Sequence, residues 1–273
     1  MKLIKYIILG IIQGFTEPLP VSSSGHIFIF KYLFNSDISN DLSFEIIVNA
    51  GSLLAVCLIY RKRLVNLLYG FIIYLKDKNI RYKSSFKYSL YILVGCIPAG
   101  IIGFLLKDYI ESVISMSFTI VGISFIITSI FLYLVRNIDN FRKELTFNDA
   151  LYIGIVQTIA LLPGISRSGS TLIAGLLCGL SKEESFDYSF MLYIPISFGT
   201  TILGIKDLIN NDIEFLPYFL GFIFSFVVSF FTLKWFRNIV RNGKLIYFSI
   251  YCLLMGLFVL IFMWYNIFGE YYV

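Results

Sequence analysis

Six long apolar segments constrain this chain more than any other feature. Each has about the 20 residues that an α-helix needs to cross the hydrocarbon core of a bilayer. They are 44–60, 88–106, 118–135, 186–205, 216–234 and 245–265. Hydrophobic residues make up 58% of the 273-residue chain and charged residues only 14%, whereas soluble domains hold about 45–50% and about 25%. We therefore predict an all-α polytopic membrane protein and exclude a soluble enzyme, a disordered chain and a disulfide scaffold.

Four further apolar segments are too short to cross a bilayer. They are 3–16, 27–34, 148–162 and 171–180, and they form two pairs, each joined by a polar link rich in glycine and serine. Such a break is tolerated at membrane depth only where it lines protein or a wet cavity. We therefore predict six spanning helices plus two re-entrant helix pairs, in a single integral membrane domain over 1–273.

The charges of the loops predict which side of the membrane each loop faces. Segment 61–87 holds eight Lys or Arg and one Asp, and 234–244 holds four basic residues and no acid. Such loops are typical of the cytoplasmic side, so this charge predicts orientation rather than nucleic-acid binding. The more acidic loops 107–117 and 206–215 are then external. Alternation across the six spans makes 37–41 external, 136–149 internal and both termini external. Segment 64–75 is either an interfacial helix or a continuation of the span before it.

The two links also resemble each other in sequence. Setting position n against n+144 gives six identities in a 16-residue window, including Gly10 with Gly154 and Gln13 with Gln157. Because three spans separate the links, the two halves, about 1–135 and 145–265, must be inverted in the membrane. Inverted repeats with broken helices hold a site near the midplane, where the repeats meet. We therefore expect the two links to lie together.

The links carry ionisable residues at membrane depth. The first contains Gln13, Glu17 and His26, the only histidine, and the second contains Arg167. Such residues cost about 2.5–3.5 kcal/mol on insertion scales, so their default interpretation is functional. Structural alternatives stay open: Gln13 bonded to Glu17 across one helical turn, His26 as a merely buried residue, and Arg167 paired only with Glu17.

The types of residue in the links favour a phosphate ligand. The Arg167 guanidinium can hold phosphate with two parallel hydrogen bonds. Ser22 to Ser24 are good helix caps, and a capped helix start presents backbone N–H groups to an anion. A carboxylate such as Glu17 repels phosphate unless a divalent cation lies between them or the acid carries a proton. The sequence has no P-loop or Rossmann glycine pattern, so we predict a lipid phosphate or diphosphate rather than a nucleotide.

At these residues the chain resembles the bacterial undecaprenyl-diphosphate phosphatases, also called bacitracin-resistance proteins. The matching motifs are Gln13-x-x-x-Glu17, the run from Pro20 to His26, and the run from Pro163 to Thr171. The resemblance implies hydrolysis of undecaprenyl diphosphate to the monophosphate and inorganic phosphate, with a divalent cation such as Mg²⁺ or Ca²⁺. It places the site on the outer face of the bacterial plasma membrane, where the lipid carrier is recycled for cell-wall synthesis and bacitracin resistance arises. Many members have Glu at position 13, which leaves this chain one carboxylate fewer.

By motif position the resemblance implicates four catalytic residues, Glu17, Ser23, His26 and Arg167. The candidates for binding the substrate phosphates are Ser22, Ser24, Gly25, Ser166, Ser168, Gly169 and Thr171. Glu17 is the metal-ligand candidate, with Gln13 supporting it. Ser23 lies three residues before His26, so the two could touch. Either Ser23 is the nucleophile, with His26 or Glu17 taking its proton, or a water attacks and Ser23 only binds phosphate.

The expected partners are a polyprenyl diphosphate and membrane lipids, and a homodimer stays open. The main alternative function is a transporter that flips a polyprenyl phosphate, because inverted repeats and broken helices are shared with secondary transporters. The cluster of Glu17, Ser23 and His26 favours the enzyme, since a binding site has less need of a base, a hydroxyl and an acid within one short link.

Overall fold

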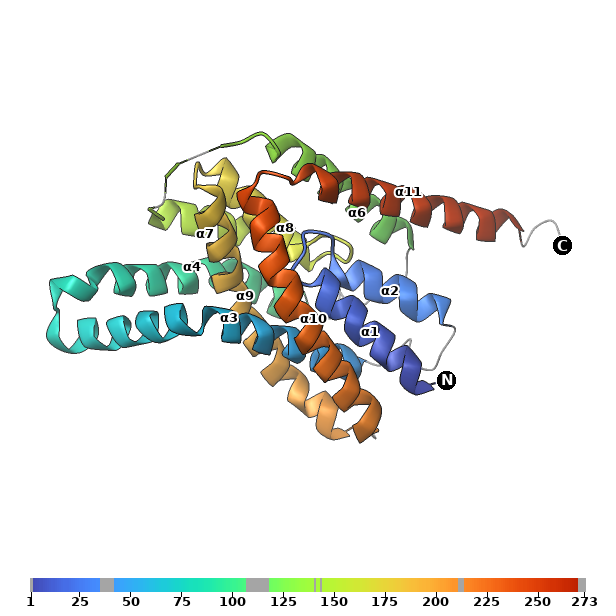
Figure 1. Cartoon of the computed structure of the whole chain (residues 1–273), viewed down its shortest axis with the longest axis horizontal. Helices are drawn as coiled ribbons and strands as arrows, with labels where there is room; N and C mark the ends of the chain where they lie inside the picture. Colours follow the sequence, from blue (N-terminus) through green and yellow to red (C-terminus); the bar gives the residue numbers. More distant parts are fainter. Residues whose placement is uncertain are drawn as a thin grey trace.

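The computed structural model describes residues 2–34, 42–106, 118–139, 141–142, 144–210 and 214–269. Within these ranges the regular elements are helices, and the one β-type pairing is an isolated bridge between Arg142 and Leu180. The loops at 37–41 and 107–117, predicted to be external, lie outside the described residues. Figure 1 shows the helices packed at several steep angles rather than as a parallel bundle.

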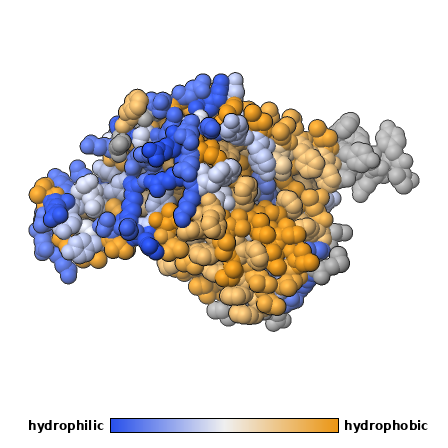
Figure 2. Space-filling view, in the orientation of Figure 1, coloured by the Kyte–Doolittle hydropathy of each residue, from blue (hydrophilic) through white to orange (hydrophobic). Residues whose placement is uncertain are grey.

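Among the residues that the structure describes, five helices are long and apolar enough to cross a membrane. They are α3 (Leu42–Asp77), α4 (Lys83–Leu105), α6 (Phe118–Val135), α9 (Lys182–Asn210) and α10 (Phe215–Arg241). The predicted sixth span coincides with α11 (Ile246–Gly269), whose described apolar stretch, Ile246–Phe262, is shorter than those five. Apolar atoms cover one side of the molecule and hydrophilic atoms gather at the other in Figure 2.

The first span is much longer than its predicted limits of 44–60. Helix α3 runs on to Asp77, so the apolar segment 64–75 continues it, as one of the two alternatives had it. The continuation packs beside α4 after a short turn, η2 (Ile80–Tyr82). A Cβ on Gly70 would lie 2.6 Å from the Cβ of Ser85, so the small residue allows this close approach. The contact is tertiary, and the hydropathy of α3 alone does not reveal it.

The short apolar segments form two hairpins of broken helices. The first is α1 (Lys2–Thr16) and α2 (Ser23–Leu33); the second is α7 (Phe147–Gln157) with η3 (Thr158–Leu161), followed by α8 (Arg167–Leu177). Prolines at 18, 20 and 163 stop the first helix of each pair, because proline removes a backbone donor. Ser22 and Ser166 then cap α2 and α8, accepting hydrogen bonds from the amides of Gly25 (3.3 Å) and Gly169 (3.1 Å).

Each hairpin packs against a helix from the other part of the chain. Helix α1 lies along α10, and α7 lies along α4. Both contacts are glycine to glycine: a Cβ on Gly10 would lie 2.5 Å from the carbonyl oxygen of Gly221, and a Cβ on Gly154 would lie 2.5 Å from that of Gly95. Backbones approach this closely only where small residues face each other. These contacts bring the ends of α1 and α7, where the helices break, into the interior of the molecule.

Candidate active site

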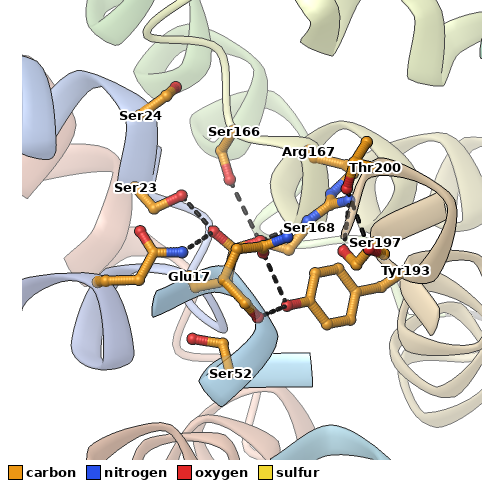
Figure 3. A network of polar contacts seen from close by, with 12 residues as sticks. Glu17, Ser23, Ser24, Ser52, Ser166, Arg167, Ser168, Tyr193, Ser197 and Thr200 are labelled. Carbon is orange, nitrogen blue, oxygen red and sulfur yellow. Dashed lines mark hydrogen bonds and ion pairs between the residues drawn. The ribbon is translucent and has the colours of Figure 1, made fainter. Parts of the chain in front are cut away.

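The two helix breaks meet at an ion pair. Glu17 directly follows α1, its amide still donating to the carbonyl of Gln13 (2.9 Å), and Arg167 is the first residue of α8. The Nη2 of Arg167 donates to the Oε1 of Glu17. The two links therefore lie together, as expected, although Glu17 and Arg167 are 150 positions apart in the sequence (Figure 3).

The Glu17 carboxylate is held by donors from three directions. Besides Arg167 on Oε1, the Ser23 hydroxyl and the Gln13 amide (Nε2, 3.1 Å) both donate to Oε2. The side chain of Glu17 is only 11% exposed. A carboxylate has about four lone-pair positions, so these donors leave one on Oε1. The predicted support of Glu17 by Gln13 is present as this hydrogen bond, and Ser23 is aimed at the same carboxylate.

Helix α9 holds the guanidinium of Arg167 in place. The Cζ of Arg167 lies 4.3 Å from the centre of the Tyr193 ring, a cation–π contact, and Nη1 donates to the hydroxyl of Ser197 (3.2 Å). The Tyr193 hydroxyl in turn donates to the Oδ1 of Asn49 on α3 (3.1 Å). Sequence reasoning missed Tyr193 and Ser197. A signal existed: Ser189, Tyr193 and Ser197 are four residues apart, which puts three polar side chains on one face of an apolar helix.

A small cavity of about 10 Å³ lies beside this ion pair, which is room for about one water molecule. It is lined by Glu17, Pro18, Ser52, Val56, Arg167, Ser168, Ser189, Phe190 and Tyr193. The lining therefore combines one carboxylate and one guanidinium with hydroxyl groups and apolar walls. The low dielectric of the interior strengthens the attraction of the Arg167 guanidinium for a bound anion.

His26 lies away from the carboxylate and does not pair with Ser23. Its Nδ1 is 2.7 Å from the carbonyl oxygen of Ser22, and its Nε2 is 2.6 Å from the hydroxyl of Tyr251 on α11. The ring is 2% exposed and packs edge-on against Phe125. The possible Ser23–His26 contact is therefore not formed, because both imidazole nitrogens have partners and the Ser23 hydroxyl turns to Glu17 instead. Here His26 anchors the first turn of α2.

The other polar residues of the links mostly hold the links together. Ser168 donates to the carbonyl of Leu19 (2.9 Å), and so does Ser166 at 3.4 Å, which ties the second link to the first. Ser22, with φ of 64°, lies in the left-handed region that is uncommon for residues other than glycine. Its hydroxyl is 3.2 Å from that of Ser24.

Thr171, a predicted phosphate ligand, is buried away from the cavity. The Thr171 hydroxyl donates to the carbonyl of Arg167 (2.9 Å) and lies 2.5 Å from the hydroxyl of Ser189. The residue is 1% exposed. A threonine one turn into a helix satisfies its hydroxyl on the preceding turn, so it does not line the cavity. Gly25 and Gly169 serve close packing: a Cβ on Gly25 would lie 2.9 Å from the ring of Phe125, and one on Gly169 would lie 3.2 Å from Pro20.

The described residues contain no group of three or more His, Cys, Asp or Glu that could hold a metal ion. Glu17 is the one carboxylate at the cavity, and it keeps a lone-pair position free of protein donors. Mg²⁺ is commonly bound through one or two carboxylates, with substrate phosphates and water completing its shell. The residues present therefore fit a cation that shares its ligands with a phosphate substrate.

Comparisons with known proteins agree with this chemistry. A family model described as "Bacitracin resistance protein BacA" matches residues 6–258. The chain is 43% identical over 267 residues to "Undecaprenyl-diphosphatase 1" of Bacillus licheniformis, covering 96% of this chain and 98% of the relative. It is also 43% identical over 267 residues to "Undecaprenyl-diphosphatase" of Oceanobacillus iheyensis, covering 96% and 97%.

Proposed function

Because the chain belongs to the bacitracin resistance protein family, we propose that it hydrolyses undecaprenyl diphosphate to undecaprenyl phosphate and inorganic phosphate. The observation that carries the proposal is the Glu17–Arg167 contact at the cavity, where a base and a phosphate-binding group meet inside a membrane protein. The reaction would return the lipid carrier to cell-wall synthesis and so counter bacitracin.

The proposed arrangement in the membrane has six spanning helices and two re-entrant pairs, with halves 1–135 and 145–265 inverted. The matching packing of α1 on α10 and of α7 on α4 supports it, as do the capping serines of the two links, 144 positions apart. The site would open to the outer face of the plasma membrane, since the basic hairpin at 61–87 marks the cytoplasmic side.

Arg167 is proposed to bind the terminal phosphate of the substrate. The substrate oxygens would compete with Glu17 for the guanidinium, while Tyr193 and Ser197 keep it in place. The planar fork would then stabilise charge on the phosphoryl group as the bond to the leaving phosphate breaks. The start of α8 at Arg167 adds the positive end of a helix dipole.

Glu17 is proposed as the general base. The Ser23 hydroxyl already donates a hydrogen bond to Glu17. Transfer of that proton to the carboxylate would leave an alkoxide able to attack the terminal phosphorus in line. A P–O bond to Ser23 would form as the bridging P–O bond breaks, and water would then hydrolyse the phosphoserine. In the alternative, Glu17 takes the proton of an attacking water and Ser23 binds phosphate. His26 would act through the backbone of Ser22, by holding Ser23 in place.

A divalent cation is proposed to bind together with the diphosphate. Glu17 would hold it through the lone pair that protein donors leave free. When bound, the cation neutralises negative charge on the transferring and leaving phosphates. Gln13 would keep the carboxylate oriented by its hydrogen bond.

Phosphate release in detergent micelles tests the proposal against a flippase. The purified chain is given undecaprenyl diphosphate, first with a chelator and then with rising Mg²⁺ or Ca²⁺. Micelles have no second compartment, so repeated turnover with phosphate release can come only from hydrolysis. We expect turnover that rises with the cation. Absence of release, with lipid monophosphate crossing the bilayer in vesicles, would instead identify a transporter.

A further inference from the structure

The outer part of α3 and the start of α4 form a hairpin that the proposed reaction does not use. This basic hairpin (residues 61–87) extends away from the other helices in Figure 1. Helix α3 has 36 residues and is therefore about 54 Å long, against about 30 Å for a hydrocarbon core. A stretch this long is accommodated by tilting, so the position of the hairpin relative to the membrane depends on its surface.

An apolar stripe runs along the exposed face of the hairpin. Its residues are Val65 (63% exposed), Leu68 (63%), Tyr69 (57%), Ile72 (52%) and Leu75 (49%). Steps of three and four residues place these side chains on one helix face. The same face continues back into the spanning part of α3, where Leu54 and Leu58 are also exposed. Arg61 and Lys62 separate the two apolar parts of this face. Exposed apolar parts of this kind are typical of a surface covered by lipid or protein rather than by water.

Cations border this stripe. Seven are exposed and the hairpin has one acid, Asp77. The seven are Arg61, Lys62, Lys76, Lys78, Arg81, Lys83 and Lys87. No salt bridge joins any of them to a carboxylate in the described part of the chain, whereas Arg63, which points inward, pairs with Glu184 and Asp187. Hydrophilic and apolar atoms are mixed over the end of the hairpin in Figure 2.

The stripe and the cations meet in an open hollow lined by Arg61, Lys62, Val65 and Asn66. Two cations and an amide donor there could hold a phosphodiester, and Leu58 and Val65 on either side could contact acyl chains. This is the arrangement expected where a lipid headgroup meets the hydrocarbon boundary.

We propose that the basic hairpin lies in the headgroup region of the inner leaflet and that this hollow binds the phosphate of an anionic phospholipid. The positive charge of the hairpin favours an anionic lipid over a second copy of the chain. A second copy of the chain in a two-fold dimer would place the same patch against itself, so the seven cations would face seven cations. Lipid also explains why exposed apolar residues follow on both sides of Arg61 and Lys62 along α3.

Quenching by brominated lipids tests the proposal. In a chain with Trp235→Phe and Trp264→Phe, Leu68→Trp reports on the hairpin and Phe104→Trp, 77% exposed on α4, reports on an ordinary lipid-facing surface. Each is reconstituted in phosphatidylcholine vesicles that contain either brominated phosphatidylglycerol or brominated phosphatidylcholine. We expect quenching of the Leu68→Trp reporter to be at least about threefold stronger with brominated phosphatidylglycerol, because each basic residue adds to the attraction for an anionic lipid surface. The Phe104→Trp reporter should show no preference between the two lipids.

Charge variants distinguish phosphate binding in the hollow from attraction of anionic lipid by basic residues elsewhere. Arg61→Gln with Lys62→Gln should clearly lower the preference at Leu68→Trp, while Lys234→Gln with Lys244→Gln should leave it unchanged. Phosphate release should be unchanged in both pairs, which shows that they fold. Loss of quenching by both lipids would mean that water or protein covers the hairpin and would overturn the proposal. An unchanged preference in the Arg61 and Lys62 variant would overturn the hollow as the site.

Discussion

Arg167 combines three kinds of contact that a different cation could not reproduce. Its guanidinium pairs with Glu17, donates to Ser197 from a second nitrogen, and stacks over Tyr193. A lysine ammonium is a point charge without a fixed fork and stacks less well on an aromatic ring. These contacts fix the orientation of the guanidinium, which supports the proposal that Arg167 is an oriented phosphate ligand rather than a source of charge alone.

Arg167→Lys should therefore fold but react slowly. Losing the two-pronged contact to the phosphoryl oxygens should cost about 1–3 kcal/mol of transition-state stabilisation, or about 5- to 150-fold in kcat/KM. The measurement is the rate of phosphate release from undecaprenyl diphosphate, with the melting temperature as a control for folding. Nearly full turnover with lysine would show that Arg167 is only the structural partner of Glu17.

Single residues also show what the sequence could predict of the site. Glu17 and Arg167 stand out because charge at membrane depth is costly. Tyr193 was not predicted, because its role depends on how α9 packs over α8. The partner of His26 is Tyr251, 225 positions away, and no local pattern indicates that pairing.

Among the elements, α1 matters because Glu17 directly follows it. The fit of α1 against α10 depends on the glycine contact at Gly10, where a Cβ would meet the backbone of Gly221 and nothing flexible could yield. Backbone atoms can make room only if the two helices separate. The position of Glu17 is thus coupled to the packing of a helix pair.

Gly10→Ala should push α1 away from α10. Overpacking of this kind costs about 1–3 kcal/mol, so we expect a lower melting temperature and a lower rate of phosphate release. The matched control is Gly100→Ala, because a Cβ on Gly100 has no neighbour within 4 Å. Equal behaviour of the two variants would show that the close approach of α1 and α10 is not needed.

The start of α7 is fixed by Asp149, outside the spanning helices. Arg142 donates to both carboxylate oxygens, at 2.6 Å and 3.1 Å, and Asp149 and Thr146 form a capping box. Arg142 also donates to the carbonyl of Cys178 at the end of α8. Burial raises the pKa of Asp149, but the hydrogen bonds from Arg142 and Thr146 outweigh it, so the pKa is lowered overall.

The lowered pKa means that ionised Asp149 stabilises the fold above the ordinary pKa of an aspartate, and that this contribution is lost as pH falls through the lower folded-state pKa. Asp149→Asn should reduce the unfolding free energy by about 1–3 kcal/mol at pH 7. The difference from wild type should shrink below about pH 4. Thermal unfolding in detergent at several pH values measures both. A difference that does not change with pH would mean that the charge of Asp149 plays no part.

The helix positions were predictable where residues within the link itself end the helix. Proline, glycine and serine stand at both links, so the two hairpins appeared in the sequence nearly at their observed ends. The sequence left open whether α3 continues through 64–75, since the outer half of the helix is stabilised by α4 and its charged residues resemble a loop. Hydropathy identifies apolar stretches but does not show where a helix ends beyond them.

At the scale of the whole molecule, orientation decides which side the site serves. The basic hairpin is proposed to lie on the cytoplasmic side of the membrane and segment 37–41 on the outer side. In a chain whose four cysteines are replaced, Asn79→Cys should react with an impermeant thiol reagent only from the cytoplasmic side. Asn40→Cys should react only from outside. Labelling with the sides exchanged would invert the topology and move the site to the opposite face.

The central claim is that Glu17 is the group that moves a proton at the junction of the two hairpins, with Gln13 orienting it. The most direct measurement compares initial rates of phosphate release from undecaprenyl diphosphate for Glu17→Gln and Gln13→Ala, on protein shown to be folded. Glu17→Gln should lose about 100-fold or more, because an amide cannot accept the proton. Gln13→Ala should lose only the worth of one hydrogen bond, about 0.5–1.5 kcal/mol. An active Glu17→Gln beside an inactive Gln13→Ala would show that Glu17 is a packing residue and contradict the account.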